Sequence, residues 1–167
     1  DREMNFLFFI FSLPLLYWPQ GVETAPQIKQ AGLEQIAVPP ESVDDWRNAG
    51  VRVIAMPKNE LEGRDRLLVP GIQRRINVAS PTRVPWVDAN GWRFLRRPGG
   101  QYLYDVPAGR ASLAAAESFV YNTDVVLKIE PADLEEFGKM LAFLRQFPPD
   151  DLSPIADMVL IDDGSVT

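Results

Sequence analysis

Short apolar runs alternate with amphipathic stretches along the first third of the chain. Two segments repeat the same order, QAGLEQIAVP at residues 30–39 and NAGVRVIAMP at residues 48–57. In each segment a helical stretch closes with Ala-Gly, a strand of Ile, Val and Ala follows, and a proline ends the strand. The glycines suit the left-handed position after a helix, and the prolines cannot continue the ladder of a central strand. The repeat therefore predicts alternating strands and helices, with parallel pairing and right-handed crossovers.

The neighbouring segments extend this alternation. LPLLYW at residues 13–18 is the predicted upstream strand, and TAPQIKQAG forms the helix after it, with Thr24 as N-cap and Pro26 in the first turn. The next helix, ESVDDWRNAG, begins with Ser42 and Asp45 at capping-box spacing, with Asp in place of the usual Glu. Three consecutive strand and helix steps favour a parallel α/β core.

The regular alternation fades between residues 58 and 107. Pro81, Pro85 and the sequences DANG and PGG separate short apolar runs, which is typical of turns. GWRFL and QYLYDV, joined by RRPGG, are predicted to form an antiparallel hairpin. We therefore expect residues 76–107 to leave the core as an excursion, and long insertions of this kind often serve as lids or binding loops.

Alternation returns after residue 107. The sequence predicts an Ala-rich helix in AGRASLAAAESFVYN, a strand in DVVLKI and a helix in PADLEEFGKMLAFLRQF. Leu134, Phe137, Leu141 and Leu144 repeat at the helical period of the last of these. FPPDDLSPIAD is predicted to be a linker, and MVLIDD one more buried strand.

The predicted fold class is α/β, with a parallel, TIM-barrel-like but incomplete sheet and a β-hairpin insertion. The chain has 167 residues, whereas a closed eight-stranded barrel typically takes ~250. We expect an apolar N-terminal segment at 1–16, an α/β core at 17–147, and a linker with the start of a further α/β unit at 148–167.

The composition excludes several kinds of partner and catalytic site. The net charge of -6 argues against nucleic acid as a partner, because phosphate binding depends on clustered Lys and Arg; one basic patch remains at Arg93, Arg96 and Arg97. The chain contains no Cys and no His, which excludes a thiol nucleophile, a Ser-His-Asp triad and a His-ligated zinc. Any catalysis must use carboxylates, Lys, Arg, Tyr or a bound cofactor, and the sequence indicates no metal or cofactor.

The apolar run at residues 6–16 carries no charge. As a helix it would reach about 16 Å, roughly half the hydrocarbon thickness of a bilayer. It is therefore interpreted as a signal peptide, a membrane anchor or a buried strand, the strand being LPLLYW. The first two interpretations imply an exported or membrane-associated protein, with membrane contact through Phe6 to Leu16, and the third leaves a cytoplasmic location open.

Candidate site residues lie where predicted strands end, because ligands of parallel sheets bind at the carboxyl ends of the strands. Two carboxylates near each other can divide the acid and nucleophile roles of glycoside cleavage, and flat aromatic side chains can stack on sugar rings. Each candidate also has a structural interpretation: a strand-ending turn for the Asp162 pair, an exposed face for Glu117, and ordinary packing for the aromatics. Lys128 and Glu130 also follow a predicted strand end, and Glu130 is expected to cap a helix. The predicted catalytic residues are Asp162, Asp163 and Glu117, and the predicted substrate-binding residues are Tyr17, Trp18, Glu60, Trp86 and Asp88.

Three stretches carry a resemblance to a known group: YWPQG…TAPQIKQAGLEQIAVPPESVDDWRNAG, NVASPTRVPWVDANGWRF and AGRASLAAAESFVYNTDVVLKIEPADL. Over residues 15–165 the chain resembles bacterial proteins related to glycoside-hydrolase-type TIM barrels. IADMVLIDDGSVT is similar to the first strand of the flavodoxin-like domain that follows the barrel in some β-galactosidase-type enzymes. The resemblance implies a carbohydrate-active protein, usually exported and usually longer, but no acid and nucleophile pair of such enzymes matches this sequence residue by residue.

Three classes of function follow. The first is a glycoside-hydrolase-like enzyme, which requires two carboxylates that converge. The second is a carbohydrate-binding module, which requires exposed aromatics on one concave face. The third is a structural or accessory subunit, held to a membrane, a protein partner or the remainder of a longer chain by residues 6–16. We expect carbohydrate as the ligand.

Overall fold

A computed structural model describes residues 13–74, 87–97 and 99–147, without the side chains of Arg74, Val87 and Asp88. Several sequence predictions lie outside this part of the chain. They concern Trp86, Asp162 and Asp163, the apolar residues 6–12, and the linker, strand and further α/β unit expected at 148–167.

Six described strands are joined by parallel pairing. Four of them form one sheet in the order β1-β8-β7-β4, and β2 pairs with β3 in a second. A parallel bridge between Tyr17 and Ala37 connects the two sheets, so that the combined order is β3-β2-β1-β8-β7-β4. The strands are β1 (Leu15–Leu16), β2 (Gln35–Val38), β3 (Arg52–Ala55), β4 (Asp65–Arg66), β7 (Gln101–Asp105) and β8 (Asp124–Lys128).

This order follows the chain around an open barrel. Each strand lies beside the described parallel strand that precedes or follows it in sequence, and the first and last of them, β1 and β8, pair with each other. Among the described strands, β3 and β4 are not paired, so the barrel is not closed. The predicted α/β class with a mostly parallel, incomplete sheet is confirmed.

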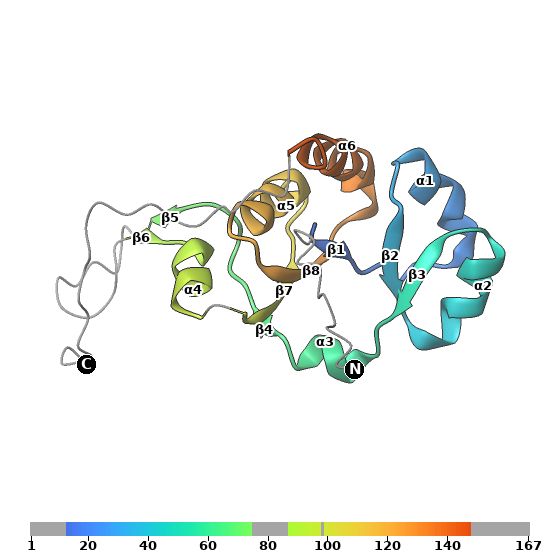
Figure 1. The fold of residues 1–167 in the computed structure, drawn as a ribbon, viewed down its shortest axis with the longest axis horizontal. Coiled ribbons are helices and arrows are strands. Elements are labelled where there is room, and N and C mark those ends of the chain that lie inside the picture. The colour runs from blue at the N-terminus through green and yellow to red at the C-terminus, as the bar shows by residue number, and fades with distance from the viewer. Residues whose placement is uncertain (1–12, 75–86, 98, 148–167) are drawn as a thin grey trace, which may run out of the picture.

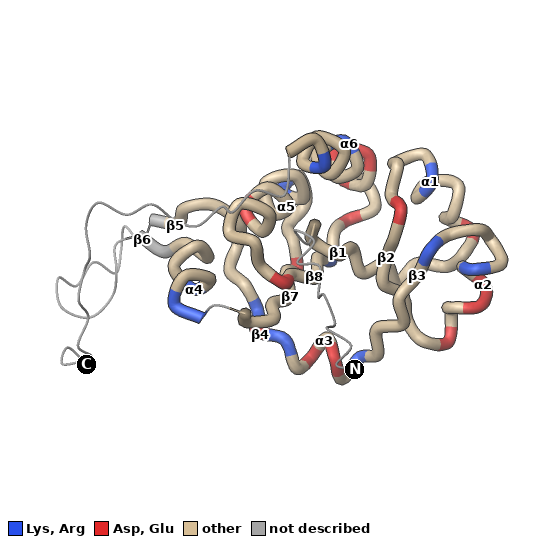
Figure 2. The backbone as a smooth tube through the Cα atoms, viewed as in Figure 1, with Lys and Arg blue, Asp and Glu red and all other residues tan. Residues whose placement is uncertain are grey.

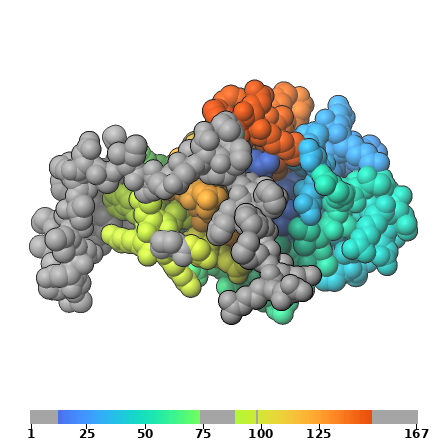
Figure 3. All heavy atoms as spheres, in the orientation of Figure 1, coloured from blue at the N-terminus to red at the C-terminus, as the bar shows by residue number. Residues whose placement is uncertain are grey.

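Helices surround the strands (Figure 1). The helices predicted around residues 24–32, 42–50, 108–122 and 131–147 are all present. Figure 3 shows α6 beside α1 at the surface, where Gly138 of α6 approaches the backbone carbonyl of Ala31. The helices are α1 (Ala25–Gln30), α2 (Val43–Asn48), α3 (Lys58–Glu62), α4 (Asn90–Arg96), α5 (Ala111–Val120) and α6 (Leu134–Leu144), and 3-10 turns at Val22–Thr24, Pro40–Ser42 and Pro131–Asp133 precede α1, α2 and α6.

The ends of α1 and α2 are partly as predicted. Gly32 and Gly50 have φ of 69° and 76°, which confirms the left-handed position after each helix. The predicted caps are wrong, because neither Thr24 nor Ser42 makes a capping hydrogen bond. The 3-10 turn before each helix already gives these residues near-helical backbone angles, whereas a capping side chain needs an extended one. The Thr24 hydroxyl instead donates to the carbonyl of Gly21 (2.7 Å).

Alternate residues of each strand face opposite sides of the sheet. On β7, Tyr102 and Tyr104 face the helices and belong to the large core, while Leu103 faces the inner side of the open barrel. A second, smaller cluster lies on that inner side. Its members are Ala37, Met56, Leu61, Leu103 and Val126, with Leu15 and Tyr17 partly buried against them.

The excursion differs from the prediction in its details. GWRFL is part of helix α4, and QYLYDV contains β7, which pairs in parallel with both β4 and β8, so the hairpin predicted between these two segments is wrong. An antiparallel pair does occur earlier, between β5 (Gln73–Arg74) and β6 (Val87–Asp88). The loop RRPGG connects a helix to a central strand, and Gly99 in it has φ of 75°.

The described part of the apolar N-terminal run forms an inner strand. Leu15 and Leu16 pair with β8, and Leu16 is almost fully buried in the large core. The interpretation of LPLLYW as a buried strand is therefore confirmed. No helix in the described residues is long and apolar enough to cross a membrane.

Candidate functional site

A row of side chains crosses the inner face of the sheet near the carboxyl ends of its strands. Asp105 of β7 is in register with Lys128 of β8, and the backbone N–H of Tyr17 donates to Leu127 (2.8 Å), which places Tyr17 beside Lys128. Tyr17 is in register with Ala37 of β2. We call Tyr17, Asp105 and Lys128, together with Arg66 of β4, the strand-end cluster.

The charged members of the strand-end cluster share one carboxylate. Arg66 forms an ion pair with Asp105, and Lys128 Nζ lies 3.7 Å from Asp105 Oδ1. Arg66 and Asp105 side chains are more than half exposed, and that of Lys128 is 35% exposed. Exposed ion pairs of this kind contribute less than about 1 kcal/mol to the free energy of unfolding. A ligand can therefore bind these three side chains in place of the ion pairs at little cost to the stability of the fold.

Tyr17 supplies the aromatic surface of the cluster. Its ring is half-buried, and the Lys128 ammonium lies 5.6 Å from the ring centroid, within the range of a cation–π contact. Burial, with a smaller contribution from the negative charge of Glu41, raises the pKa of the Tyr17 hydroxyl. The phenol therefore stays neutral at physiological pH and can both donate and accept a hydrogen bond.

Glu130 lies at the same edge, two residues beyond Lys128. It is exposed and occupies the N-cap position of a 3-10 turn with extended backbone. The expected capping role is wrong, because the side chain makes no capping hydrogen bond. β8 ends at Lys128, which is in register with Asp105, so Glu130 follows that strand end by two residues.

Glu117 of α5 points into the molecule, where it accepts three hydrogen bonds. The donors are the Tyr104 hydroxyl, the side-chain amide of Asn90 (3.3 Å) and the backbone N–H of Gly71 (3.3 Å). Asn90 is fully buried and also bonds to both backbone groups of Leu68 (3.0 and 3.1 Å). The carboxylate therefore ties the loop after β4 to β7, α4 and α5. It has the contacts of a structural group rather than those of a carboxylate open to substrate.

The other predicted site residues are dispersed. Trp18 is 1% exposed in the large core and donates to Thr24 Oγ1 (2.9 Å), so it cannot face a sugar. Glu60 of α3 lies 3.7 Å from Arg64, which binds Asp124 at the opposite end of β8 from Lys128. The structure therefore does not bring Glu60 to the strand-end cluster. Asp88 pairs through its backbone with Gln73 in the antiparallel pair.

Two other surface features are distinct from the strand-end cluster. Basic positions gather at the end of α4 (Figure 2), where Arg97 forms an ion pair with Asp65 of β4. A depression lies at the amino ends of β2 and β3, lined by Gln35, Arg47 and residues 50–53. In barrel folds that end of the strands contributes to stability, whereas ligands bind at the other. Within the described residues, no three acidic side chains are grouped closely enough to hold a metal ion.

Comparison with protein-family models, with curated proteins and with solved structures gave no match to this chain. The resemblance to glycoside-hydrolase-type barrels therefore stays a prediction. The case for function depends on the geometry of the strand-end cluster.

Two members of the cluster were missed in the sequence. Asp105 ends a strand that was assigned to a hairpin, so its place at a strand end was overlooked. The segment YLYDVP has the same form as IAVP and IAMP, a β-rich run closed by proline, and that likeness could have identified it. Arg66 belongs to a two-residue strand, which is too short for any periodicity to indicate.

Proposed function

We propose that the protein binds carbohydrate at the carboxyl ends of its parallel strands. The observation that carries this proposal is the convergence of Tyr17, Arg66, Asp105 and Lys128 from four strands on one edge. Sugar hydroxyls both donate and accept hydrogen bonds. Asp105 provides an acceptor, Arg66 and Lys128 provide donors, and the Tyr17 ring matches the apolar face of a pyranose. Such a small set of directed polar groups around an apolar surface is typical of small-molecule sites.

Asp105 is the residue to test first. Its carboxylate holds both cations, so Asp105→Asn removes the negative charge, replaces one acceptor oxygen with an NH2 donor and weakens the hold on Arg66 and Lys128. A hydrogen bond to a charged group contributes about 1.5–3 kcal/mol, and we expect the Kd for a bound methyl glycoside to rise about 10- to 100-fold. The measurement is a titration with methyl β-D-glucopyranoside, galactopyranoside and mannopyranoside.

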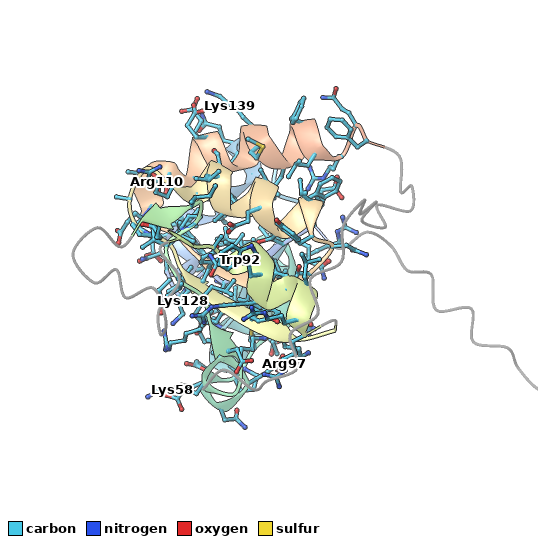
Figure 4. All side chains as sticks on the ribbon, turned by 90° about the vertical axis from the view of Figure 1, so that its left-hand side faces the viewer. Lys58, Trp92, Arg97, Arg110, Lys128 and Lys139 are labelled. Atoms are coloured by element: carbon cyan, nitrogen blue, oxygen red, sulfur yellow. The ribbon has the colours of Figure 1, made fainter. Side chains whose placement is uncertain are left out.

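Glu135→Gln is the matched control, because Glu135 is an exposed carboxylate paired with Lys139 on α6. Figure 4 shows Lys139 on α6, away from Lys128. The control variant should bind as the unchanged protein does. The proposal fails if none of the three glycosides binds, or if Asp105→Asn and Glu135→Gln bind equally well.

Hydrolysis at the same edge is the second candidate, favoured by the position of Glu130. Asp105 ends β7, and Glu130 follows the end of the neighbouring β8 by two residues. An inverting glycosidase requires two carboxyl groups on the same edge with room for a water between them. If this pair cleaves 4-nitrophenyl glycosides, Asp105→Asn and Glu130→Gln should each lower kcat by about 100-fold or more. A rate that neither substitution changes would contradict this candidate.

A further inference from the structure

The positive charge of the chain is concentrated in one segment. Residues 71–97 carry six arginines and one acidic residue, whereas the rest of the chain carries 11 basic and 22 acidic residues. In the described part of this segment, Arg93, Arg96 and Arg97 lie in and just after α4, and all three are exposed. A positive surface of this kind, on a chain with a net charge of -6, indicates a negatively charged partner.

Two of these arginines are available to such a partner. Arg97 forms an ion pair with Asp65, but Arg93 and Arg96 have no carboxylate partner among the described residues. Arg93 donates one long hydrogen bond, to the backbone carbonyl of Arg66 (3.5 Å). Guanidinium groups bind phosphate through two parallel hydrogen bonds, so a partner that carries phosphate suits them well.

Apolar side chains share the outer face of α4 with the arginines. Trp92 is 42% exposed and Leu95 is 52% exposed, and they lie three residues apart on the side of the helix that faces away from the buried Phe94. Arg96 lies beside Trp92, four residues further along. Basic residues in the last turn of a helix complement its dipole, but this does not account for the exposed Trp92 and Leu95.

The loop before β5 adds another apolar residue to this face. Ile72 is 71% exposed. The next residue, Gln73, is in register with Asp88, two residues before α4 begins, so Ile72 lies next to the start of that helix. Figure 4 looks onto the end of the molecule that carries α4, where Trp92 and Arg97 lie. We call the exposed residues that have no carboxylate partner here the α4 surface, which consists of Ile72, Trp92, Arg93, Leu95 and Arg96.

We infer that the α4 surface binds an anionic lipid bilayer, with its arginines on the lipid phosphates and its apolar side chains at the boundary between headgroups and acyl chains. The Trp92 ring suits this boundary because its body is apolar and its N–H can donate a hydrogen bond. The aliphatic Ile72 and Leu95 favour a bilayer over nucleic acid, because bases stack on aromatic and guanidinium groups. The inference is independent of the carbohydrate site.

The test measures how the full chain partitions onto vesicles of phosphatidylcholine and onto vesicles in which about one third of the lipid is phosphatidylserine. The protein should sediment with the phosphatidylserine vesicles and much less with phosphatidylcholine alone. Two arginines near an anionic surface favour binding about 10- to 30-fold, so Arg93→Gln/Arg96→Gln should lower the partition coefficient by that factor.

Arg47→Gln/Lys139→Gln is the matched control. It removes the same charge from two exposed positions on α2 and α6, and it should leave the partition coefficient within about twofold.

A fluorescent label tests whether the apolar side chains enter the bilayer. Because the chain contains no Cys, Leu95→Cys can carry one environment-sensitive fluorophore. Its emission should shift to the blue on phosphatidylserine vesicles. The same label at Phe143→Cys on α6 should not respond, although Phe143 is 53% exposed and Leu95 is 52% exposed.

Several results would overturn the inference. They are equal binding to the two vesicle compositions, no binding to either, an equal loss in the two double variants, or a label at residue 95 that does not respond. A single-stranded RNA that binds more tightly than the vesicles do, and that Arg93→Gln/Arg96→Gln releases, would make nucleic acid the partner of the α4 surface instead.

Discussion

Replacement of Glu117 by alanine should destabilise the fold rather than remove a catalytic group. The carboxylate accepts from the Tyr104 hydroxyl, from Asn90 and from the N–H of Gly71, and Tyr104 is 1% exposed. The bond from the phenol to a charged acceptor contributes about 1.5–3 kcal/mol, and the two longer bonds add less, so the free energy of unfolding should fall by about 2–4 kcal/mol. Urea unfolding followed by circular dichroism measures this change directly.

A double-mutant cycle makes this prediction specific. In Glu117→Ala the Tyr104 hydroxyl stays buried without an acceptor, but Tyr104→Phe removes that hydroxyl as well. The two substitutions should therefore be coupled by about 1–3 kcal/mol, whereas Glu135→Gln on the exposed face of α6 should change stability by less than about 0.5 kcal/mol. A loss below about 0.5 kcal/mol for Glu117→Ala, or additive effects in the cycle, would refute the structural role of this carboxylate.

Two further predictions concern the stability of the fold, one its dependence on pH and the other the contact between α6 and α1. Burial, and then the Glu117 carboxylate, raise the pKa of Tyr104, so the folded protein keeps a proton that the unfolded chain loses near pH 10. The free energy of unfolding should thus fall by up to about 1.4 kcal/mol per pH unit above about pH 10, and Tyr104→Phe should remove this contribution in urea titrations at pH 9 to 11. Gly138→Ala would place a Cβ 2.0 Å from the carbonyl oxygen of Ala31, and it should cost about 1–3 kcal/mol in thermal unfolding. A stabilised variant would mean that α6 does not pack against α1 so closely.

The repeated strand and helix units were predictable because local pattern and tertiary contact agree in them. Val43 and Trp46 lie on one face of α2 and are buried, and Leu134, Phe137, Leu141 and Leu144 of α6 are buried at the predicted period. A helix whose apolar residues form one stripe, next to a run of β-branched residues, has few other ways to fold.

The segment at 90–105 shows where pattern alone is insufficient. In α4, the polar Asn90 is buried together with Phe94, while the apolar Trp92 and Leu95 are exposed, so the apolar residues mark its inner face only in part. What buries Asn90 is its contact with Tyr104, Leu68 and Glu117, which are distant in the sequence. β7 is likewise a central strand only because β4 and β8 flank it, and no local pattern encodes those partners.

Two of the four residues of the strand-end cluster could be predicted from the sequence, because local pattern identifies some strands of this sheet but not others. Tyr17 and Lys128 end strands that the pattern identifies, so their place at the ligand-binding edge followed directly. Asp105 and Arg66 lie at that edge because of non-local pairing. Trp18 follows Tyr17 in the chain but points to the opposite side of the sheet, and alternation along the strand assigns only one of the two to the inner face.

Chemical-shift mapping on the unchanged protein tests the central claim most directly. Titration of ¹⁵N-labelled protein with methyl β-glycosides should shift the amide resonances of Tyr17, Asp105 and Lys128 together, with one Kd. Resonances of residues that line the depression at the amino ends of β2 and β3, such as those of Arg47 and Val51, should stay in place. No shift at any concentration, or shifts confined to that depression, would contradict a carbohydrate site at the carboxyl ends of the strands.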